Sequence, residues 1–223
     1  MVGPRTTWPT WYLLETAAQG SASGALLRAA GAKRLALVGV AFRAVIIVGN
    51  GSDGAMSAIT IHRVEPDEWE QLRDIRLRAL ANAPAAFGSS LARERGQSER
   101  YWRDWASGTT RSGDRIATFI AVAEDRWLAL AAGIRPPDDP QTAALVSMWV
   151  DPALRRRGAA HALVEAVAEW ARDQGARRLE LWVTRKNTPA RTLYLRSGFT
   201  PDGRTQPLPS RPSLIEEAMI RHL

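Results

Sequence analysis

The sequence has no cysteine and only three histidines among its 223 residues. Without cysteine there is no disulfide, no thiolate zinc or iron–sulfur site and no cysteine nucleophile. His62, His161 and His222 lie far apart in the chain, and none has another histidine nearby. We therefore expect no bound metal, and catalysis without a cysteine-linked intermediate.

Lysine is also scarce, so the net charge of +7 is carried almost entirely by arginine. An excess of positive charge favours solubility and anionic partners. The same arginine- and alanine-rich composition would follow from a G+C-rich coding sequence, and no recognised nucleic-acid motif is present. The charge therefore favours a phosphate-bearing ligand and does not indicate nucleic-acid binding.

Long apolar runs are missing as well. The run at residues 35–48 is shorter than the roughly 20 residues of a spanning helix and contains Arg43. It also lies farther from the N-terminus than the apolar region of a signal peptide. We expect no membrane partner and a cytoplasmic location.

The chain changes character near residue 55. Residues 1–55 contain only two acids, Glu15 and Asp53, whereas Met56 opens a segment whose alternation at 59–64 is typical of a first strand. We interpret 1–55 as a poorly ordered N-terminal extension, which an upstream start codon would explain, and 56–223 as the functional domain. A membrane or targeting role for the extension, or an additional packed element, is the alternative.

Periodicity over 56–223 predicts an α/β domain with a mixed sheet. Strands are expected at 59–64, 116–122, 127–132, 143–150, 179–184, after 199 and at 214–220, and helices at about 66–83, 91–105, 160–174 and 189–197. Residues 143–184 follow the order strand, helix, strand, which is the pattern of a right-handed parallel crossover.

A basic turn joins the strand and the helix of that crossover. The turn consists of Arg155, Arg156, Arg157, Gly158, Ala159 and Ala160. The first backbone N–H groups of a helix have no intrahelical partner and favour anions, and a glycine lets a phosphate approach closely. The turn thus predicts a phosphate site; a solvated charge run before an ordinary crossover helix is the alternative.

These residues resemble those of GNAT-type N-acetyltransferases over nearly all of 57–223. The likeness rests on the strand, turn and helix around Arg155-x-x-Gly158-x-Ala160, on the front end at 76–80 and 83–89, and on the run at 187–199. That run is close to the family pattern N-x-x-A-x-x-L-Y-x-x-x-G-F. The resemblance implies a mostly antiparallel central sheet flanked by helices, acetyl-CoA as donor and a primary amine as acceptor.

The family likeness also implies residue roles. The coenzyme pyrophosphate would lie on the turn 155–160, and its pantetheine arm beside the strand residues Met148, Trp149 and Val150. Asn187 would bind the arm, and Tyr194 would protonate the departing thiolate. Asn187 and Tyr194 are seven residues apart, so a helix starting at Asn187 carries both on one face.

The base for the acceptor amine is left open, because the strand at 143–150 lacks the glutamate that some family members have there. A water chain or a distant carboxylate such as Glu94 are the alternatives. We expect the acceptor site between 84–105 and a loop at 201–213. Tyr101, Trp102 and Trp105 are expected to form a satellite hydrophobic cluster, and a place in the lining of the acceptor site is the alternative. Direct transfer in a ternary complex is the expected mechanism; a non-catalytic acyl-CoA-binding regulatory domain is the competing function, and a homodimer, common in the family, is left open.

Overall fold

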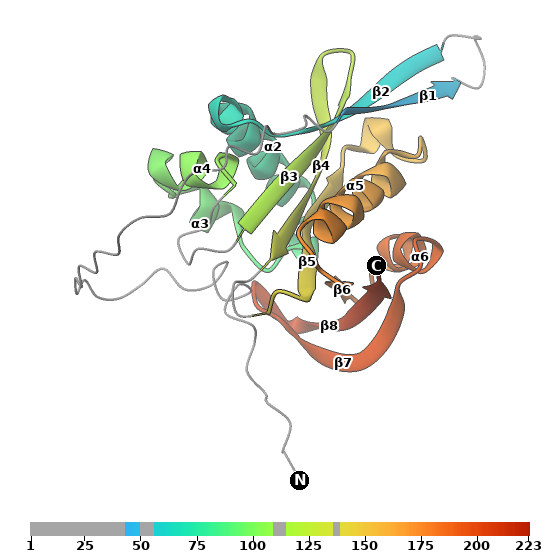
Figure 1. Ribbon diagram of the computed structural model, residues 1–223. Helices are drawn as coiled ribbons and strands as arrows, with labels where there is room; N and C mark the ends of the chain where they lie inside the picture. The colour runs from blue at the N-terminus through green and yellow to red at the C-terminus, as the bar shows by residue number, and fades with distance from the viewer. Residues whose placement is uncertain (1–42, 50–55, 109–114, 136–138) are drawn as a thin grey trace, which may run out of the picture.

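The computed structural model describes residues 43–49, 56–108, 115–135 and 139–223. Within these ranges, eight strands form one sheet in the order β1-β2-β3-β4-β5-β6-β8-β7 (Figure 1). The strands are β1 (Arg43–Gly49), β2 (Met56–Arg63), β3 (Arg115–Ala123), β4 (Arg126–Arg135), β5 (Thr142–Val150), β6 (Arg178–Thr184), β7 (Thr200–Leu208) and β8 (Arg211–His222).

Helices cover both faces of this sheet. They are α2 (Trp69–Asn82), α3 (Leu91–Arg95), α4 (Glu99–Ala106), α5 (Ala159–Asp173) and α6 (Thr188–Arg196), with 3-10 turns η1 (Pro66–Glu68), η2 (Pro84–Ala86) and η3 (Pro152–Leu154). The expected α/β fold, with helices flanking a mostly antiparallel sheet, is confirmed.

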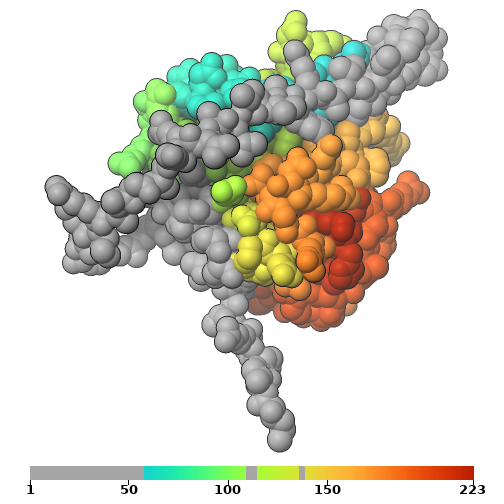
Figure 2. Space-filling model, viewed as in Figure 1, coloured from blue at the N-terminus to red at the C-terminus, as the bar shows by residue number. Residues whose placement is uncertain are grey.

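Two apolar cores lie on opposite faces of the sheet because alternate strand residues point to opposite sides. Phe119 and Ala131 face α5 with Leu163 and Val167, whereas neighbouring residues such as Leu130 face the layer of α2, α3 and α4. In the space-filling view, the helices of the N-terminal half (cyan and green) and the C-terminal segments (orange and red) gather on opposite sides (Figure 2).

The sheet has one parallel pair in its described part, between β5 and β6. The pairing covers only Thr142–Ala144 against Arg178–Glu180, after which β5 continues to Val150 without a partner on its β6 side. The crossover through α5 confirms the strand–helix–strand unit expected at 143–184. The split between β5 and β6 opens the sheet in its middle.

Close packing between β4 and α5 makes Gly133 a sensitive position. A Cβ at Gly133 would lie 2.5 Å from two ring atoms of Trp170, so Gly133→Ala should push α5 away from the sheet. Overpacking of this kind costs about 1–3 kcal/mol. Urea unfolding measures the loss. Gly96→Ala is the control, since its nearest contact would be 3.6 Å away; equal stability of the two variants would contradict the prediction.

The N-terminal segment is described only in part. Residues 43–49, within the expected extension, form β1 and pair antiparallel with β2 from Arg43↔His62 to Gly49↔Met56. The remainder of the extension, at 1–42 and 50–55, lies outside the described residues, so its poor order and the upstream-start explanation stay predictions. At residues 43–49 the structure instead has a strand that pairs with the domain, which is the alternative of an additional structural element.

Two sequence-based expectations about local structure are wrong. The helix expected at 91–105 is two helices, because Gly96 ends α3 and Ser98 begins α4 by accepting a hydrogen bond from the Tyr101 N–H at 3.3 Å. The loop expected at 201–213 is instead most of the β7–β8 hairpin. Its prolines suggested a loop, but β7 is an edge strand, where proline is tolerated.

Candidate active site

The split in the sheet is accompanied by a bulge in β5. The register of β4 against β5 shifts by one residue between Leu130↔Trp149 and Ala132↔Val146. The extra residue is accommodated at Ser147, whose φ of +58° is in the left-handed region. A bulge bends its strand, so the end of β5 turns away from β6.

The basic turn places an open helix N-terminus beside this bent strand. Gly158 is the N-cap of α5 with φ +80°, and no side chain caps the helix there. A Cβ at Gly158 would meet no atom within 4 Å, so the space in front of the first α5 N–H groups is open. Arg156 also has a positive φ of +63°, and the backbone of the turn is therefore held in a tight, exposed bend.

These elements border one cavity of about 940 Å³, a size typical of sites for small molecules and cofactors. Its walls come from the end of β5, the turn before α5 and the start of α6. Of the residues that the sequence predicted to bind the coenzyme, those that line it are Met148, Trp149, Val150, Arg155, Arg156, Gly158, Ala159, Ala160 and Asn187. Arg157 and Tyr194, also predicted, do not line it.

Arg155 is partly engaged in structure. Its Nε donates to the Val150 carbonyl at 3.2 Å, and its Nη2 lies 3.4 Å from Oδ1 of Asn82. The Trp149 indole donates to the same Asn82 oxygen at 3.0 Å. Arg155 therefore ties the turn to β5 and α2, and Arg156, which is exposed at the cavity edge, is better placed to meet an anion.

Asn187 is the N-cap of α6, where its Oδ1 accepts a hydrogen bond from the Ala190 N–H at 3.3 Å. Asn187 can both cap α6 and take part in ligand binding, because its amide NH₂ group can still donate to a ligand. Sequence reasoning missed the α6 residues on the same wall. They are Pro189, Ala190, Thr192, Leu193 and Arg196, and their three- and four-residue spacing was the signal that could have identified them.

Tyr194 points to a different side of α6 from the cavity wall. It is 6% exposed, belongs to the α5 core and packs edge-to-face on Phe199, with ring centroids 5.8 Å apart. Burial raises the pKa of its phenol far above the ordinary value. The side chain therefore keeps its proton at neutral pH, but it lies in the α5-side core and does not line the cavity.

A second, smaller cavity of about 50 Å³ lies in the split itself. It is lined by Ala86, Phe87, Gly88, Ala144, Leu145, Val146, Ser147, Leu181, Trp182 and Glu216. Ala86 borders both cavities, and the adjacent bulge residues Ser147 and Met148 line one each. Both cavities therefore border the β5 bulge, and the smaller one is also lined by Phe87 and Trp182.

A buried ion pair supports the bulge from the side of α2. Arg76 is fully buried and donates to both carboxylate oxygens of Glu94, at 2.9 and 2.5 Å, and to Oγ of Ser147 at 3.2 Å. Its guanidinium also lies 4.7 Å from the Phe87 ring centroid. Glu94 is therefore committed to Arg76, which removes it as the free base that the sequence left open.

The aromatic cluster of α4 lies away from both cavities. Trp102 and Trp105 stack at 5.7 Å with an interplanar angle of 11°, inside the core under α2. The three aromatic residues are therefore packing residues, as expected, but they belong to one of the two main cores and not to a satellite cluster. His161 lines the larger cavity and contacts Oγ of Ser197 at 3.1 Å through Nδ1.

Within the described ranges, no three or more acidic or histidine side chains are grouped to hold a metal ion. No helix in those ranges combines the length and apolar character needed to cross a membrane.

Comparison with known proteins places this geometry in a family. The family model "Acetyltransferase (GNAT) family" matches residues 69–199, more than half of the chain. The streptothricin acetyltransferase of Streptomyces lavendulae is 37% identical over 82 residues, which are 37% of this chain and 43% of that protein. The mycothiol acetyltransferase of Beutenbergia cavernae is 38% identical over 79 residues, 29% of this chain and 27% of that protein. The chain thus spans less than half the length of these relatives.

Solved structures agree in fold. A GNAT acetyltransferase from Streptococcus pneumoniae superimposes with a TM-score of 0.62 at 18% identity, covering 74% of this chain and 99% of that one. The GNAT domain of PAT from S. lividans gives 0.60 at 18% identity, covering 81% and 97%. From the matched residues and the shared fold, the chain belongs to the acetyltransferase (GNAT) family.

Proposed function

We propose that this chain is an acetyl-CoA-dependent N-acetyltransferase that moves the acetyl group directly to a primary amine within a ternary complex. One juxtaposition chiefly supports the proposal. The uncapped N-terminus of α5 and the edge of β5 beyond Ala144 border the same cavity. The first offers N–H groups to phosphates, and the second offers backbone groups to an amide-containing arm.

The residues present suit the coenzyme. Its pyrophosphate would take the α5 N–H groups at Gly158, Ala159 and Ala160, with Arg156 and Arg196 supplying positive charge at the cavity border. The pantetheine arm would pair with the backbone of Met148–Val150, as an added strand does, and the Asn187 NH₂ would donate to one of its amide carbonyls. Arg157 does not line the cavity, so it would attract the coenzyme only through long-range electrostatics.

Transfer forms a C–N bond and breaks the thioester C–S bond. The amine must lose a proton, since an alkylamine with a pKa near 10.4 is almost entirely charged at neutral pH, and the thiolate must gain one. Because the chain has no cysteine, no cysteine-linked acyl-enzyme can form, which favours direct transfer from acetyl-CoA to the amine.

Release of coenzyme A on mixing acetyl-CoA with amines tests this proposal. Because the protein has no cysteine, a thiol reagent reports released coenzyme without background from the enzyme. Thiol release that depends on both the amine and the protein is expected. The competing function, a domain that binds acyl-CoA without chemistry, instead predicts coenzyme binding with no release for any amine.

We keep Tyr194 as the proposed acid for the departing thiolate, with the requirement that its hydroxyl reach the cavity. Tyr194→Phe retains the packing on Phe199 and removes only the proton donor. We expect kcat to fall by about 10²–10⁴ while the Kd for acetyl-CoA is unchanged. Steady-state kinetics and calorimetric titration measure the two quantities; an unchanged kcat would make Tyr194 a core residue only.

Three expectations remain proposals: a cytoplasmic location, a homodimer, and the absence of nucleic-acid and membrane partners. Size-exclusion chromatography with light scattering tests the second directly.

A further inference from the structure

A buried carboxylate lies in the small cavity of the split. Glu216 on β8 is 3% exposed and lines this cavity with Ser147 and Trp182. Its carboxylate accepts a hydrogen bond from Nε2 of Gln206 on β7, which holds the side chain in place. Nearly all the other lining residues are apolar or glycine, so Glu216 supplies the negative charge of this wall.

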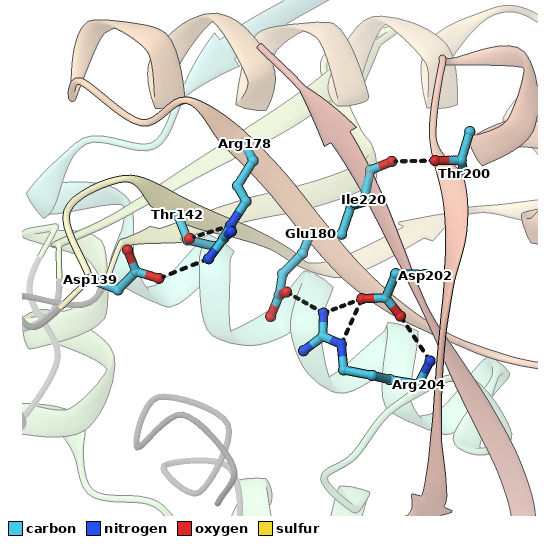
Figure 3. A network of polar contacts seen from close by, with 8 residues as sticks. All are labelled: Asp139, Thr142, Arg178, Glu180, Thr200, Asp202, Arg204 and Ile220. Carbon is cyan, nitrogen blue, oxygen red and sulfur yellow. Dashed lines mark hydrogen bonds and ion pairs between the residues drawn. The ribbon is translucent and has the colours of Figure 1, made fainter. Parts of the chain in front are cut away.

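The other buried glutamates in the described ranges serve different purposes. Glu94 is bound by Arg76, as above. Glu180 on β6 accepts from Arg204 at 2.7 Å, in a network in which Arg204 also holds Asp202 (Figure 3). Neither Glu94 nor Glu180 lines either of the two cavities described above, whereas Glu216 lines the smaller one. Burying a carboxylate is costly, and one kept at a cavity wall is a candidate for a functional role.

The position of the cavity relates Glu216 to the reaction. An acetyl thioester whose arm pairs with Met148–Val150 arrives at the bulge from the α5 side. The small cavity borders the bulge at Ser147, next to Met148 in the wall of the larger cavity. A nucleophile in it would therefore approach the thioester carbonyl through the split, with Glu216 in the same cavity.

Resting on the proposed acetyltransferase function, we propose that Glu216 binds the acceptor ammonium in this cavity and takes its proton. The amine nitrogen then attacks the thioester carbon, forming the C–N bond, and the C–S bond breaks. The first proton leaves the ammonium for the Glu216 carboxylate before the attack. A second proton leaves nitrogen as the C–S bond breaks and balances the one that the departing thiolate receives to become the coenzyme thiol, and Glu216 then releases its proton to solvent. The products are an acetamide and coenzyme A.

The cavity also selects a class of amine. Its volume of about 50 Å³ admits a few heavy atoms, which suits an unhindered aminomethyl end with the rest of the acceptor outside. An α-amino acid would bring its own carboxylate against Glu216, between apolar walls where like charges repel strongly. The acceptors are therefore alkylamines without a carboxylate next to the amine.

Two matched variants of β8 test the role of Glu216. Glu216→Gln keeps the shape and removes the charge, and we expect kcat/KM for tyramine to fall by at least about 10² with the Kd for acetyl-CoA unchanged. Glu217→Gln is the control, since Glu217 is the neighbouring residue, binds Arg191 and lines neither cavity. Thiol release that persists unchanged in Glu216→Gln would overturn the Glu216 assignment and leave the acetyltransferase function standing.

The wild-type protein supplies a test that does not depend on folding of a variant. Tyramine and tyrosine, or agmatine and arginine, differ only in the carboxylate beside the amine. We expect the decarboxylated member of each pair to be acetylated at least about tenfold more efficiently, and equal use would overturn the assignment. If the protein releases no thiol with any amine, calorimetry of tyramine against the coenzyme A-loaded protein decides: binding lost in Glu216→Gln supports the site, and no binding to the wild type overturns it.

Discussion

Replacing Gly158 by glutamate is expected to abolish acetyl-CoA binding. The substitution puts a carboxylate in the open space before the α5 N–H groups, where the coenzyme phosphates are proposed to lie. A ligand at 100 times its Kd adds about 2.7 kcal/mol to the stability of a protein that binds it only when folded. Thermal unfolding with and without acetyl-CoA should show this gain in the wild type and none in Gly158→Glu.

Gly175→Glu is the matched control for this experiment. Gly175 follows the other end of α5 and has φ +82°, close to the +80° of Gly158, and a Cβ there also meets nothing within 4 Å. Both variants should therefore lose about 1–2 kcal/mol from backbone strain. Only Gly175→Glu should retain the gain from acetyl-CoA. A full gain in Gly158→Glu would show that the coenzyme does not use this turn.

Removal of the Glu94 carboxylate is expected to lower the free energy of unfolding more than any other substitution proposed for this protein. Glu94→Ala leaves the fully buried Arg76 guanidinium without the two hydrogen bonds that it donates to this carboxylate. Breaking a buried pair from one side typically costs about 3–5 kcal/mol, because the remaining charge stays in a medium that solvates it poorly. Urea unfolding of the wild type and the variant measures the difference.

Two further variants separate charge burial from general loss of contacts. Glu99→Ala breaks an exposed i,i+4 pair with Arg103, which should cost no more than about 1 kcal/mol. The double variant Arg76→Met with Glu94→Leu removes both charges and should be more stable than Glu94→Ala alone. A cost below about 1 kcal/mol for Glu94→Ala would mean that water or another group satisfies Arg76.

The Arg76 pair also links stability to the site, because Arg76 donates to Ser147 at the bulge. The bulge in turn sets the direction of the β5 edge that is proposed to hold the coenzyme arm. The α2–α4 layer thus supports the site through a contact between residues 71 positions apart in the sequence.

Most of the fold and most residues of the proposed coenzyme site could be predicted from the sequence, because the signals for them are local. Apolar alternation, helix spacing and the turn before α5 depend on neighbouring residues, and so does the N-cap at Asn187. Tyr194 shows the limit of such reasoning. Its spacing from Asn187 predicts one shared helix face, but Asn187 is the N-cap of α6 and lines the cavity, whereas the packing of α6 turns Tyr194 toward Phe199.

The amino-acid sequence by itself determined the α/β class, the absence of cysteine chemistry and the basic turn before α5, which is proposed to bind phosphate. Only the tertiary structure decided where the sheet splits, that Glu94 is bound by Arg76, and that Glu216 lines the cavity in the split. These features join segments from α2, β5 and β8 that are remote in sequence. Their burial and pairing depend on long-range contacts, which leave no periodic or spacing signal in any one segment.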